Sequence, residues 1–143
     1  MQIGQVLRRK GNDVITVDGA KTVRDALALL AEHGIGALVV SGDGQRIDGI
    51  LSERDIARGL HQRGASVLDE PVSGVMTAEV HTCVPTAGVH DLAQMMTDRR
   101  VRHVPVMDGD ALIGIVSIGD VVKARLDELE DERKQLVDYI QTA

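Results

Sequence analysis

Apolar and polar positions along the chain follow a pattern that occurs twice. In the first half, the pattern predicts an extended segment at 14–17, a helix at 22–33, strands at 37–40 and 47–51, and a helix that starts near Glu53. In the second half, it predicts an extended segment at 80–83, a helix at 88–99, strands at 103–107 and 112–116, and a helix that starts near Ile118. Each half therefore has the order β-α-β-β-α, which predicts an α/β (α+β) fold.

The two halves are also related residue by residue. Residues 35–40 align with 101–106 at an offset of 66, and residues 49–55 align with 114–120 at an offset of 65. The one-residue slip falls in the turn between the two strands of each half, where insertions are tolerated. A unit of about 60 residues buries its faces poorly when alone, so we expect two pseudo-symmetric repeats packed as one body.

The predicted boundaries follow from this duplication. Residues 1–63 form the first repeat, 64–71 a linker, 72–126 the second repeat and 127–143 a C-terminal helix extension, within one module of 1–143. Towards this end of the chain, apolar side chains recur at intervals of four, three, seven and four residues: Val122, Leu126, Leu129, Leu136 and Ile140. Such a stripe either folds back on the module or packs against a partner chain, and its narrow, a/d-like spacing favours helix pairing in a dimer.

Composition restricts both the core and the partners. The chain is 43% hydrophobic but has no Phe, no Trp and one Tyr, so the core must consist of Val, Ile, Leu, Ala and Met. A net charge of -6 and the lack of aromatic stacking platforms argue against nucleic-acid binding. One cysteine, Cys83, allows no internal disulfide framework and indicates a reducing compartment. No apolar run approaches the roughly 20 residues of a membrane span, so we expect a cytoplasmic protein without membrane contact.

The strongest chemical signal is the pattern Gly-apolar-apolar-Ser-x-x-Asp, which occurs at 49–55 and again at 114–120. The serine stands where an apolar strand ends and a helix begins, so its hydroxyl and the first free N–H groups of the helix can bind an anion. The aspartate one turn further on can accept two hydrogen bonds at once, as the cis-diol of a ribose requires. An ordinary capping box has the same Ser-x-x-Asp spacing and binds no ligand. The duplication, with the same glycine in each copy, favours a ligand site.

Together with ERDIAR, VSGVMT, RVRHVPV and GIVSIGDVVKAR, the duplicated motif resembles the CBS (cystathionine-β-synthase) domain pair. The resemblance runs from about residue 3 to residue 140, and the chain is similar to the small stand-alone bacterial CBS proteins and to the plant organellar proteins that resemble them. It implies tandem CBS repeats that form a Bateman module, with clefts that bind AMP, ATP, NAD(H) or related adenosyl ligands. It also implies a disc-shaped homodimer.

The resemblance further implies the site residues. Asp55 and Asp120 would hold ribose hydroxyls, and Ser52 and Ser117 would contact phosphate. The adenine would be bordered by residues of the strands and of the segments before them: Thr16, Val17, Ala37, Leu38, Thr82, Val84, Pro85, Val104 and Pro105.

The two copies differ at the expected phosphate end. Arg54 beside the first aspartate is replaced by glycine in the second copy, whereas Arg102 and His103 of the second copy are replaced by Gly-Ala in the first. Arg58 and Lys123, each three residues beyond its aspartate, are either ligand contacts or solvated helix charges. We therefore predict that the two clefts differ in ligand or in affinity.

These observations predict a regulatory module that is not an enzyme, needs no catalytic cofactor and acts on a regulated protein that the sequence does not identify. AMP is the first expectation for its ligand, with ATP or NAD(H) as alternatives; a ligand-free dimerisation scaffold is the alternative function.

A hydrolase built on Ser117, His103 and Asp120 is disfavoured because no Gly-x-Ser-x-Gly elbow is present. The pair His81-x-Cys83 is too sparse for a metal site, and Cys83 is expected to be a small buried residue.

Overall fold

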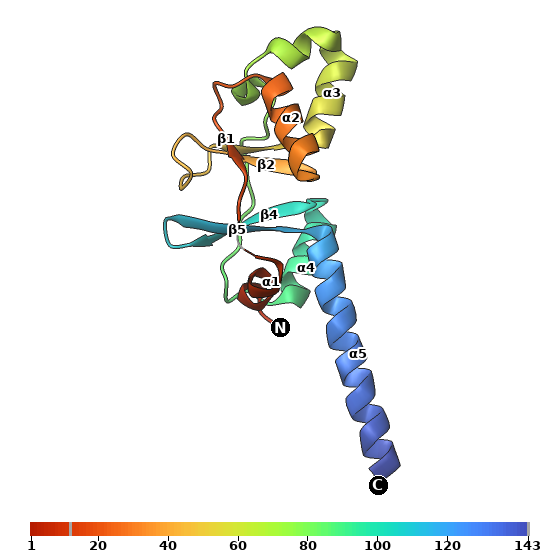
Figure 1. Cartoon of the computed structure of the whole chain (residues 1–143). Helices are drawn as coiled ribbons and strands as arrows, with labels where there is room; N and C mark the ends of the chain where they lie inside the picture. Colours follow the sequence, from red (N-terminus) through yellow and green to blue (C-terminus); the bar gives the residue numbers. More distant parts are fainter. Residues whose placement is uncertain (12, 143) are drawn as a thin grey trace.

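The computed structural model describes residues 1–11 and 13–142 and contains two units, one above the other in Figure 1. The first consists of β1 (Thr16–Val17), α2 (Val23–His33), β2 (Ala37–Val40), β3 (Gly49–Ser52) and α3 (Glu53–Arg63), followed by the short 3-10 helices η1 (Gly64–Asp69) and η2 (Val72–Gly74). The second consists of α4 (Val89–Arg99), β4 (His103–Asp108), β5 (Ala111–Ser117) and α5 (Ile118–Thr142), with α1 (Ile3–Lys10) beside them. The predicted fold class, tandem repeats with a long C-terminal helix, is confirmed.

The first unit is built on a three-stranded sheet in the order β1-β2-β3. β1 pairs with β2 in parallel and β2 pairs with β3 antiparallel, which places Ala37 opposite Ser52 and Val40 opposite Gly49. All four residues of β2 are buried, as expected for a wholly apolar strand at the centre of a sheet. Because β3 ends at Ser52 and α3 begins at Glu53, the motif serine stands at the junction between strand and helix.

In the second unit, β4 and β5 form an antiparallel hairpin, and the extended segment predicted at 80–83 is reduced to one parallel bridge between Cys83 and Val106. The N–H of Cys83 donates to the carbonyl of Pro105 over 3.0 Å, and the N–H of Met107 donates to the carbonyl of Cys83 over 2.9 Å. The next bond of a parallel ladder would come from the N–H of residue 105, which a proline lacks. The ladder therefore stops after one bridge.

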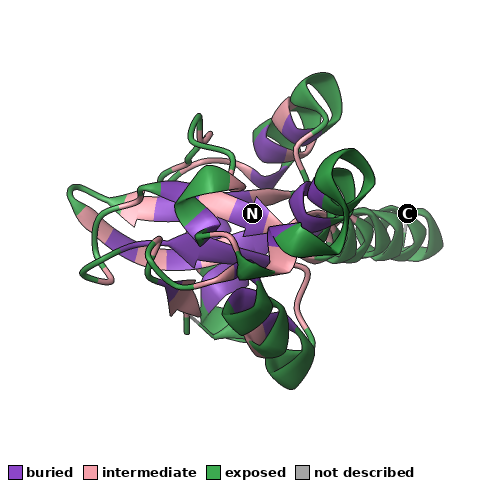
Figure 2. Cartoon of the chain, turned by 90° about the horizontal axis from the view of Figure 1, so that it is seen from above, coloured by how far each residue is buried: buried purple, intermediate pink, exposed green. Residues whose placement is uncertain are grey.

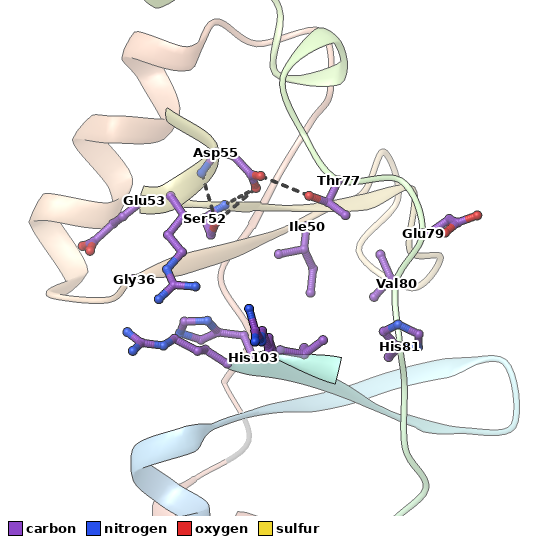
Figure 3. A pocket seen from close by; sticks show the side chains of 14 residues that line it. Gly36, Ile50, Ser52, Glu53, Asp55, Thr77, Glu79, Val80, His81 and His103 are labelled. Atoms are coloured by element: carbon purple, nitrogen blue, oxygen red, sulfur yellow. Dashed lines mark hydrogen bonds between the residues drawn. The ribbon is translucent and has the colours of Figure 1, made fainter. Parts of the chain in front are cut away.

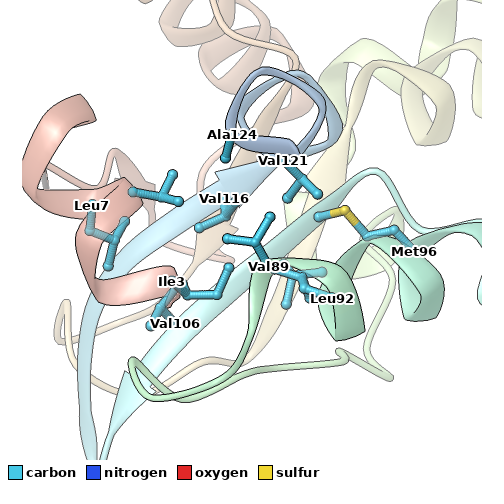
Figure 4. Packing of buried hydrophobic residues seen from close by; sticks show 11 residues of the cluster. Ile3, Leu7, Val89, Leu92, Met96, Val106, Val116, Val121 and Ala124 are labelled. Atoms are coloured by element: carbon cyan, nitrogen blue, oxygen red, sulfur yellow. The ribbon is translucent and has the colours of Figure 1, made fainter. Parts of the chain in front are cut away.

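Two segments cross between the units. α1, which was not among the predicted elements, precedes the first unit in sequence but packs in the core of the second, where Ile3 and Leu7 lie beside Val116 (Figure 4). η2 follows the first unit and contributes Val72 to its core before the chain continues into the second unit. The second core is therefore incomplete without a segment from the opposite end of the chain.

This crossing explains the glycine of each motif. A Cβ atom on Gly114 would lie 2.6 Å from Leu7 Cδ2, and a Cβ atom on Gly49 would lie 2.6 Å from Met76 Sδ and 2.8 Å from the carbonyl oxygen of Thr77. The strands leave no room for a side chain where α1 and the segment after η2 pass over them. The shared glycine is thus a packing requirement, and by itself it does not indicate a ligand.

Both cores are aliphatic, as the composition predicts. The strands and the inward faces of the helices carry the buried residues, whereas the outer helix faces are exposed (Figure 2). The predicted linker also contributes to the packing, because η1 covers most of 64–71 and its Val67 is fully buried beside Gly59 of α3.

α5 extends well beyond the second unit (Figure 1). Its buried residues are Val121 and Ala124, near its start, and all of residues 129–142 are exposed. The predicted apolar stripe does not fold back on the module, since Leu136 is 64% exposed and Ile140 is 71% exposed. Within the described ranges, no helix combines the length and the apolarity that crossing a bilayer would require.

Candidate functional site

A cleft between the two units contains the first motif. Its cavity, of about 250 Å³, is lined by Gly36 and Ile50, by residues 52–55 at the start of α3, by Thr77 and residues 79–81, and by residues 100–103 (Figure 3). We call this cavity the Asp55 cleft. Because its walls come from both repeats, a molecule bound in it would contact both units.

The carboxylate of Asp55 is fixed at the start of α3. Its Oδ2 accepts hydrogen bonds from the backbone N–H of Ser52 at 2.9 Å and from the Ser52 hydroxyl at 3.1 Å, and its Oδ1 accepts one from the Thr77 hydroxyl at 3.1 Å (Figure 3). The N–H of Asp55 donates to Ser52 Oγ at 3.2 Å. These bonds complete a capping box, so the capping role of the motif is present in the structure.

The same carboxylate can still accept bonds from a ligand. An ionised carboxylate offers about four lone-pair positions, and two of its three present donors are hydroxyls, which can rotate towards another acceptor. Asp55 is 8% exposed, and hydrogen bonds in such a shielded place are electrostatically stronger than in water. A diol that reached Asp55 would therefore be held firmly.

Positive groups line much of the cleft. It is bordered by three arginines and two histidines, against three carboxylates: Arg54, Arg100, Arg102, His81 and His103, with Glu53, Asp55 and Glu79. The three arginines balance the three carboxylates in a chain whose net charge is -6, so a bound phosphate would depend on direct contact with the arginines. Burial, and then the nearby charge of Lys10, lower the pKa of His103 below its usual 6.5. The histidine is therefore neutral at pH 7, and the arginines carry the positive charge.

Several of these residues were missed by the sequence analysis. The segment 77–81 lies outside the duplicated motif, and only the fold brings Thr77 and His81 to the cleft. The sequence could have indicated the unusual position of Arg100, because the offset of 66 aligns this arginine with a glycine, Gly34. Both residues end a helix in the left-handed conformation, with φ of 54° and 61°.

The second motif has a different partner. The N–H of Ser117 donates to Asp120 Oδ2 at 2.9 Å and the N–H of Asp120 donates to Ser117 Oγ at 3.2 Å, which is the same capping geometry. Lys10, at the end of α1, donates to Asp120 Oδ2 at 2.6 Å and to the carbonyl of Ile115 at 2.8 Å. Burial raises the pKa of Asp120, but the bonds from Lys10 and Ser117 outweigh it and hold the pKa below its usual 3.8. Asp120 is therefore an ion-paired carboxylate.

The remaining predicted site residues are dispersed. Those that line the Asp55 cleft are Ser52, Arg54, Asp55, Arg102 and His103. Asp120 and Lys123 border a cavity of about 230 Å³ beside α1, and Thr82 borders an open hollow near Arg46. The others line neither the Asp55 cleft nor the cavity beside Asp120: Thr16, Val17, Ala37, Leu38, Arg58, Val84, Pro85, Val104, Pro105 and Ser117. Five of them are buried in the structure: Val17, Ala37, Leu38, Val104 and Pro105.

Cys83 lies apart from the Asp55 cleft and packs against the second core. Burial raises its pKa to about 11, so the thiol is protonated and a weak nucleophile at pH 7.

Across the part of the chain that the structure describes, no three His, Cys, Asp or Glu side chains gather as a metal site would require.

The fold and the cleft define a class of protein, a pair of β-α-β-β-α units with a polar cleft between them. A family model of the CBS domain matches the chain twice, at residues 3–62 and 72–127. The chain belongs to the CBS domain family and carries two copies of the domain. The resemblance inferred from the motifs is thereby confirmed.

Relatives with this arrangement come from distant organisms. The CBS domain-containing protein CBSX3, mitochondrial, of Arabidopsis thaliana is 39% identical over 150 residues, which cover 97% of this chain and 71% of the relative. The crystal structure of the CBS-domain containing protein ATU1752 from Agrobacterium tumefaciens has 41% identity and a TM-score of 0.84, over 87% of this chain and 99% of that one. The CBS domain protein PAE2072 from Pyrobaculum aerophilum, complexed with AMP, has 27% identity and a TM-score of 0.74, over 84% of this chain and 89% of that one.

Proposed function

We propose that the chain is a regulatory module that binds an adenosine-containing nucleotide in the Asp55 cleft and transmits its occupancy through a homodimer to a regulated protein. The observation that carries the proposal is a shielded, hydrogen-bonded carboxylate, Asp55, in a cavity that is also lined by three arginines. The AMP complex of the Pyrobaculum aerophilum relative supports AMP as the first ligand to test. ATP and NAD(H) are the alternatives, and the module itself catalyses no reaction.

Each part of such a nucleotide has a matching wall in the cleft. The ribose hydroxyls would donate to Asp55, and the Thr77 hydroxyl would turn away to make room. The phosphate would lie between the arginines and the start of α3, where the positive end of the helix dipole favours an anion. The adenine would lie against the apolar side chains of Ile50 and Val80, which line the cleft (Figure 3).

The position of the cleft provides a route for the signal. A bound nucleotide would bridge α3 of the first unit and residues 100–103 of the second. Binding would therefore favour the arrangement of the two units in which both walls reach the ligand. A partner that recognises this arrangement would respond to the concentration of the nucleotide.

A thermal-shift screen with AMP, ATP, NAD⁺ and NADH tests the proposal. A ligand at about 100 times its Kd should add about 2.7 kcal/mol to the free energy of unfolding, because it binds the folded state alone. Asp55→Ala should abolish the shift, since the ribose then has no acceptor.

Asp25 offers a matched control for that substitution. Thr22 and Asp25 form the same capping box at the start of α2, and neither residue lines the Asp55 cleft. Asp25→Ala should destabilise the fold by about 1 kcal/mol, as the loss of a cap does, and should retain the shift caused by the nucleotide. If Asp55→Ala kept the shift, or if Asp25→Ala lost it, the assignment of Asp55 to the ribose would be wrong.

A ligand-free dimerisation scaffold is the second candidate, and the exposed apolar stripe of α5 favours it. A stable dimer in sedimentation, with no melting shift for any of the four nucleotides, would support the scaffold over the sensor. Hydrolysis of any of these nucleotides by the purified chain would contradict both candidates.

A further inference from the structure

We propose that Lys10 closes the second cleft from within, so that each chain binds one nucleotide, in the Asp55 cleft. This inference rests on the proposed function. It comes from two motifs with the same capping geometry and different partners, because Asp55 accepts a hydrogen bond from a neutral hydroxyl, whereas Asp120 accepts one from the ammonium group of Lys10.

The crossing segments make the two clefts different. Leu7 of α1 packs against Gly114, and Met76 packs against Gly49 in the same way. α1 and the segment after η2 therefore occupy equivalent positions, with residue numbers that differ by 69. The same offset aligns Lys10 with residue 79, which is a glutamate at the wall of the Asp55 cleft. The glutamate beside the first motif is thus replaced, at the equivalent position beside the second motif, by a lysine that is bonded to Asp120.

Lys10 occupies Oδ2, one of the two carboxylate oxygens of Asp120 to which the two hydroxyls of a ribose would donate. Its Nζ lies 2.6 Å from Asp120 Oδ2 and 2.8 Å from the carbonyl oxygen of Ile115. Charge-assisted hydrogen bonds are roughly twice as strong as bonds between neutral partners. The side chains of Lys10 and Asp120 are 36% and 23% exposed, so water screens the pair only in part. A neutral diol would therefore replace a stronger interaction and leave a partly buried ammonium without its partners.

The cavity beside Asp120 has its own cations, Arg9, Lys10 and Lys123, but it has no equivalents of the arginines of the Asp55 cleft. At the offsets of 65 and 66, three arginines and one histidine of the Asp55 cleft are each replaced by a residue without a charged side chain. The pairs are Arg54 with Gly119, Arg100 with Gly34, Arg102 with Gly36, and His103 with Ala37. A nucleotide at Asp120 would thus find the sugar acceptor paired with Lys10, and its phosphate would not meet the arrangement of arginines that lines the Asp55 cleft.

Isothermal titration calorimetry with AMP and with ATP counts the sites. The wild-type chain should bind one equivalent. Lys10→Met removes the ammonium group but keeps a long side chain, so the stoichiometry should rise towards two, with the added site at least about tenfold weaker because it lacks the arginines. In the Lys10→Met chain, Asp55→Asn should remove the tighter event and leave the weaker one.

Two controls isolate the charge of Lys10. Lys10→Arg keeps a cation beside Asp120 and should keep a stoichiometry of one. Lys21→Met changes an exposed lysine of the first unit and should leave binding unchanged. Lys10→Gln is a second neutral variant if Lys10→Met does not fold, as judged by circular dichroism.

The outcomes separate this inference from the proposed function. Two equivalents bound by the wild type would overturn the inference and leave the proposed function standing. One equivalent bound by folded Lys10→Met and Lys10→Gln would overturn the role of Lys10. If neither AMP nor ATP bound to the wild type or to these variants, both the proposed function and the inference would fail.

Discussion

Arg100 combines an unfavourable backbone with a position in the cleft wall. Among the described residues it is the one non-glycine residue with a positive φ, 54°. The first unit ends its equivalent helix with Gly34 at a φ of 61°, and glycine adopts this conformation without steric cost. For a side chain the conformation costs roughly 1–2 kcal/mol. Because Arg100 lines the Asp55 cleft, we interpret this strain as retained for binding an anion.

Arg100→Gly should therefore separate stability from binding. The variant relieves the steric cost but gives the unfolded chain more freedom, so we expect a net gain of about 0.5–1 kcal/mol in the free energy of unfolding. Nucleotide binding should weaken at least about tenfold, because a charge-assisted bond is lost. Urea denaturation and calorimetry measure the two effects. Arg99→Gly, one residue earlier in α4 and outside the cleft, should instead lose about 1 kcal/mol of stability and bind normally.

His103 should make the fold sensitive to mild acid. Burial, and then the charges of Lys10 and Arg102, lower its pKa below 6.5, and two nearby carboxylates oppose this only in part. The unfolded chain therefore takes up a proton before the folded chain does. Stability should be complete above pH 6.5 and should fall as the pH drops through the lowered pKa.

Urea denaturation at about pH 7.5 and about pH 5.5 checks this expectation. The decrease in the free energy of unfolding from the higher pH to the lower pH should be smaller for His103→Gln than for the wild type. His33→Gln, which changes an exposed histidine at the end of α2, should show the wild-type loss. Equal losses in all three proteins would mean that His103 is not the group responsible.

At the scale of elements, the periodicity of apolar residues predicted the helices and strands that are determined mainly by their own sequence. The helices expected at 22–33 and 88–99 are α2 and α4, and the apolar strands lie where the pattern places them. Periodicity could not predict the shortened strand near Cys83, because its length depends on a missing N–H of Pro105 in another strand. It also gave no helix at α1, a segment of eight residues whose apolar side chains pack on a unit far along the chain.

The same division applies to the candidate site. The duplicated motif identified Ser52 and Asp55 because a strand end, a cap and a carboxylate are all local features. Thr77 and His81 could not be found in this way, since the crossing of the chain alone brings them to the cleft. Lys10 is the clearest example, because nothing near residue 10 in the sequence predicts its bond to Asp120, 110 residues away.

The motif glycines allow the crossing to be tested in both units. We expect Gly49→Ala to destabilise the fold by about 2–3 kcal/mol, because the new Cβ meets the carbonyl oxygen of Thr77, which cannot move alone. Gly114→Ala should cost about 1 kcal/mol, because its Cβ meets the end of the Leu7 side chain, which can adjust. Gly42→Ala, at a site with open space, should change stability by at most about 0.5 kcal/mol. Chemical denaturation ranks the three, and a cost for Gly114→Ala above that for Gly49→Ala would contradict this packing.

At the scale of the whole molecule, the exchange of segments joins the two repeats into one structure. α1 completes the second core, and the chain that leaves it enters the first unit at β1. The proposed site lies on the boundary that this exchange creates, with walls from both repeats. A ligand in the cleft would therefore act on the arrangement of the entire module and would not be confined to one repeat.

α5 is the part of the molecule that a single chain leaves uncovered. Its apolar stripe is exposed and ordered on a continuous helix, and the side chains recur at the spacing of a two-stranded seam. We expect this stripe to pair with α5 of a second copy, which would place two modules in a fixed relation and give the proposed signal an output.

Charge on the seam should break this pairing while leaving each chain folded. Leu129 and Leu136 are 48% and 64% exposed, so changing both to Glu should alter the stability of the monomer little, yet it would set like charges against each other between helices. Sedimentation velocity should show a dimer for the wild type and a monomer for this variant. Changing Gln135 and Gln141 to Glu adds the same charge to exposed positions of α5 outside the stripe and should keep the dimer. A monomeric wild type would contradict pairing, and a dimeric Leu129→Glu/Leu136→Glu chain would move the interface away from α5.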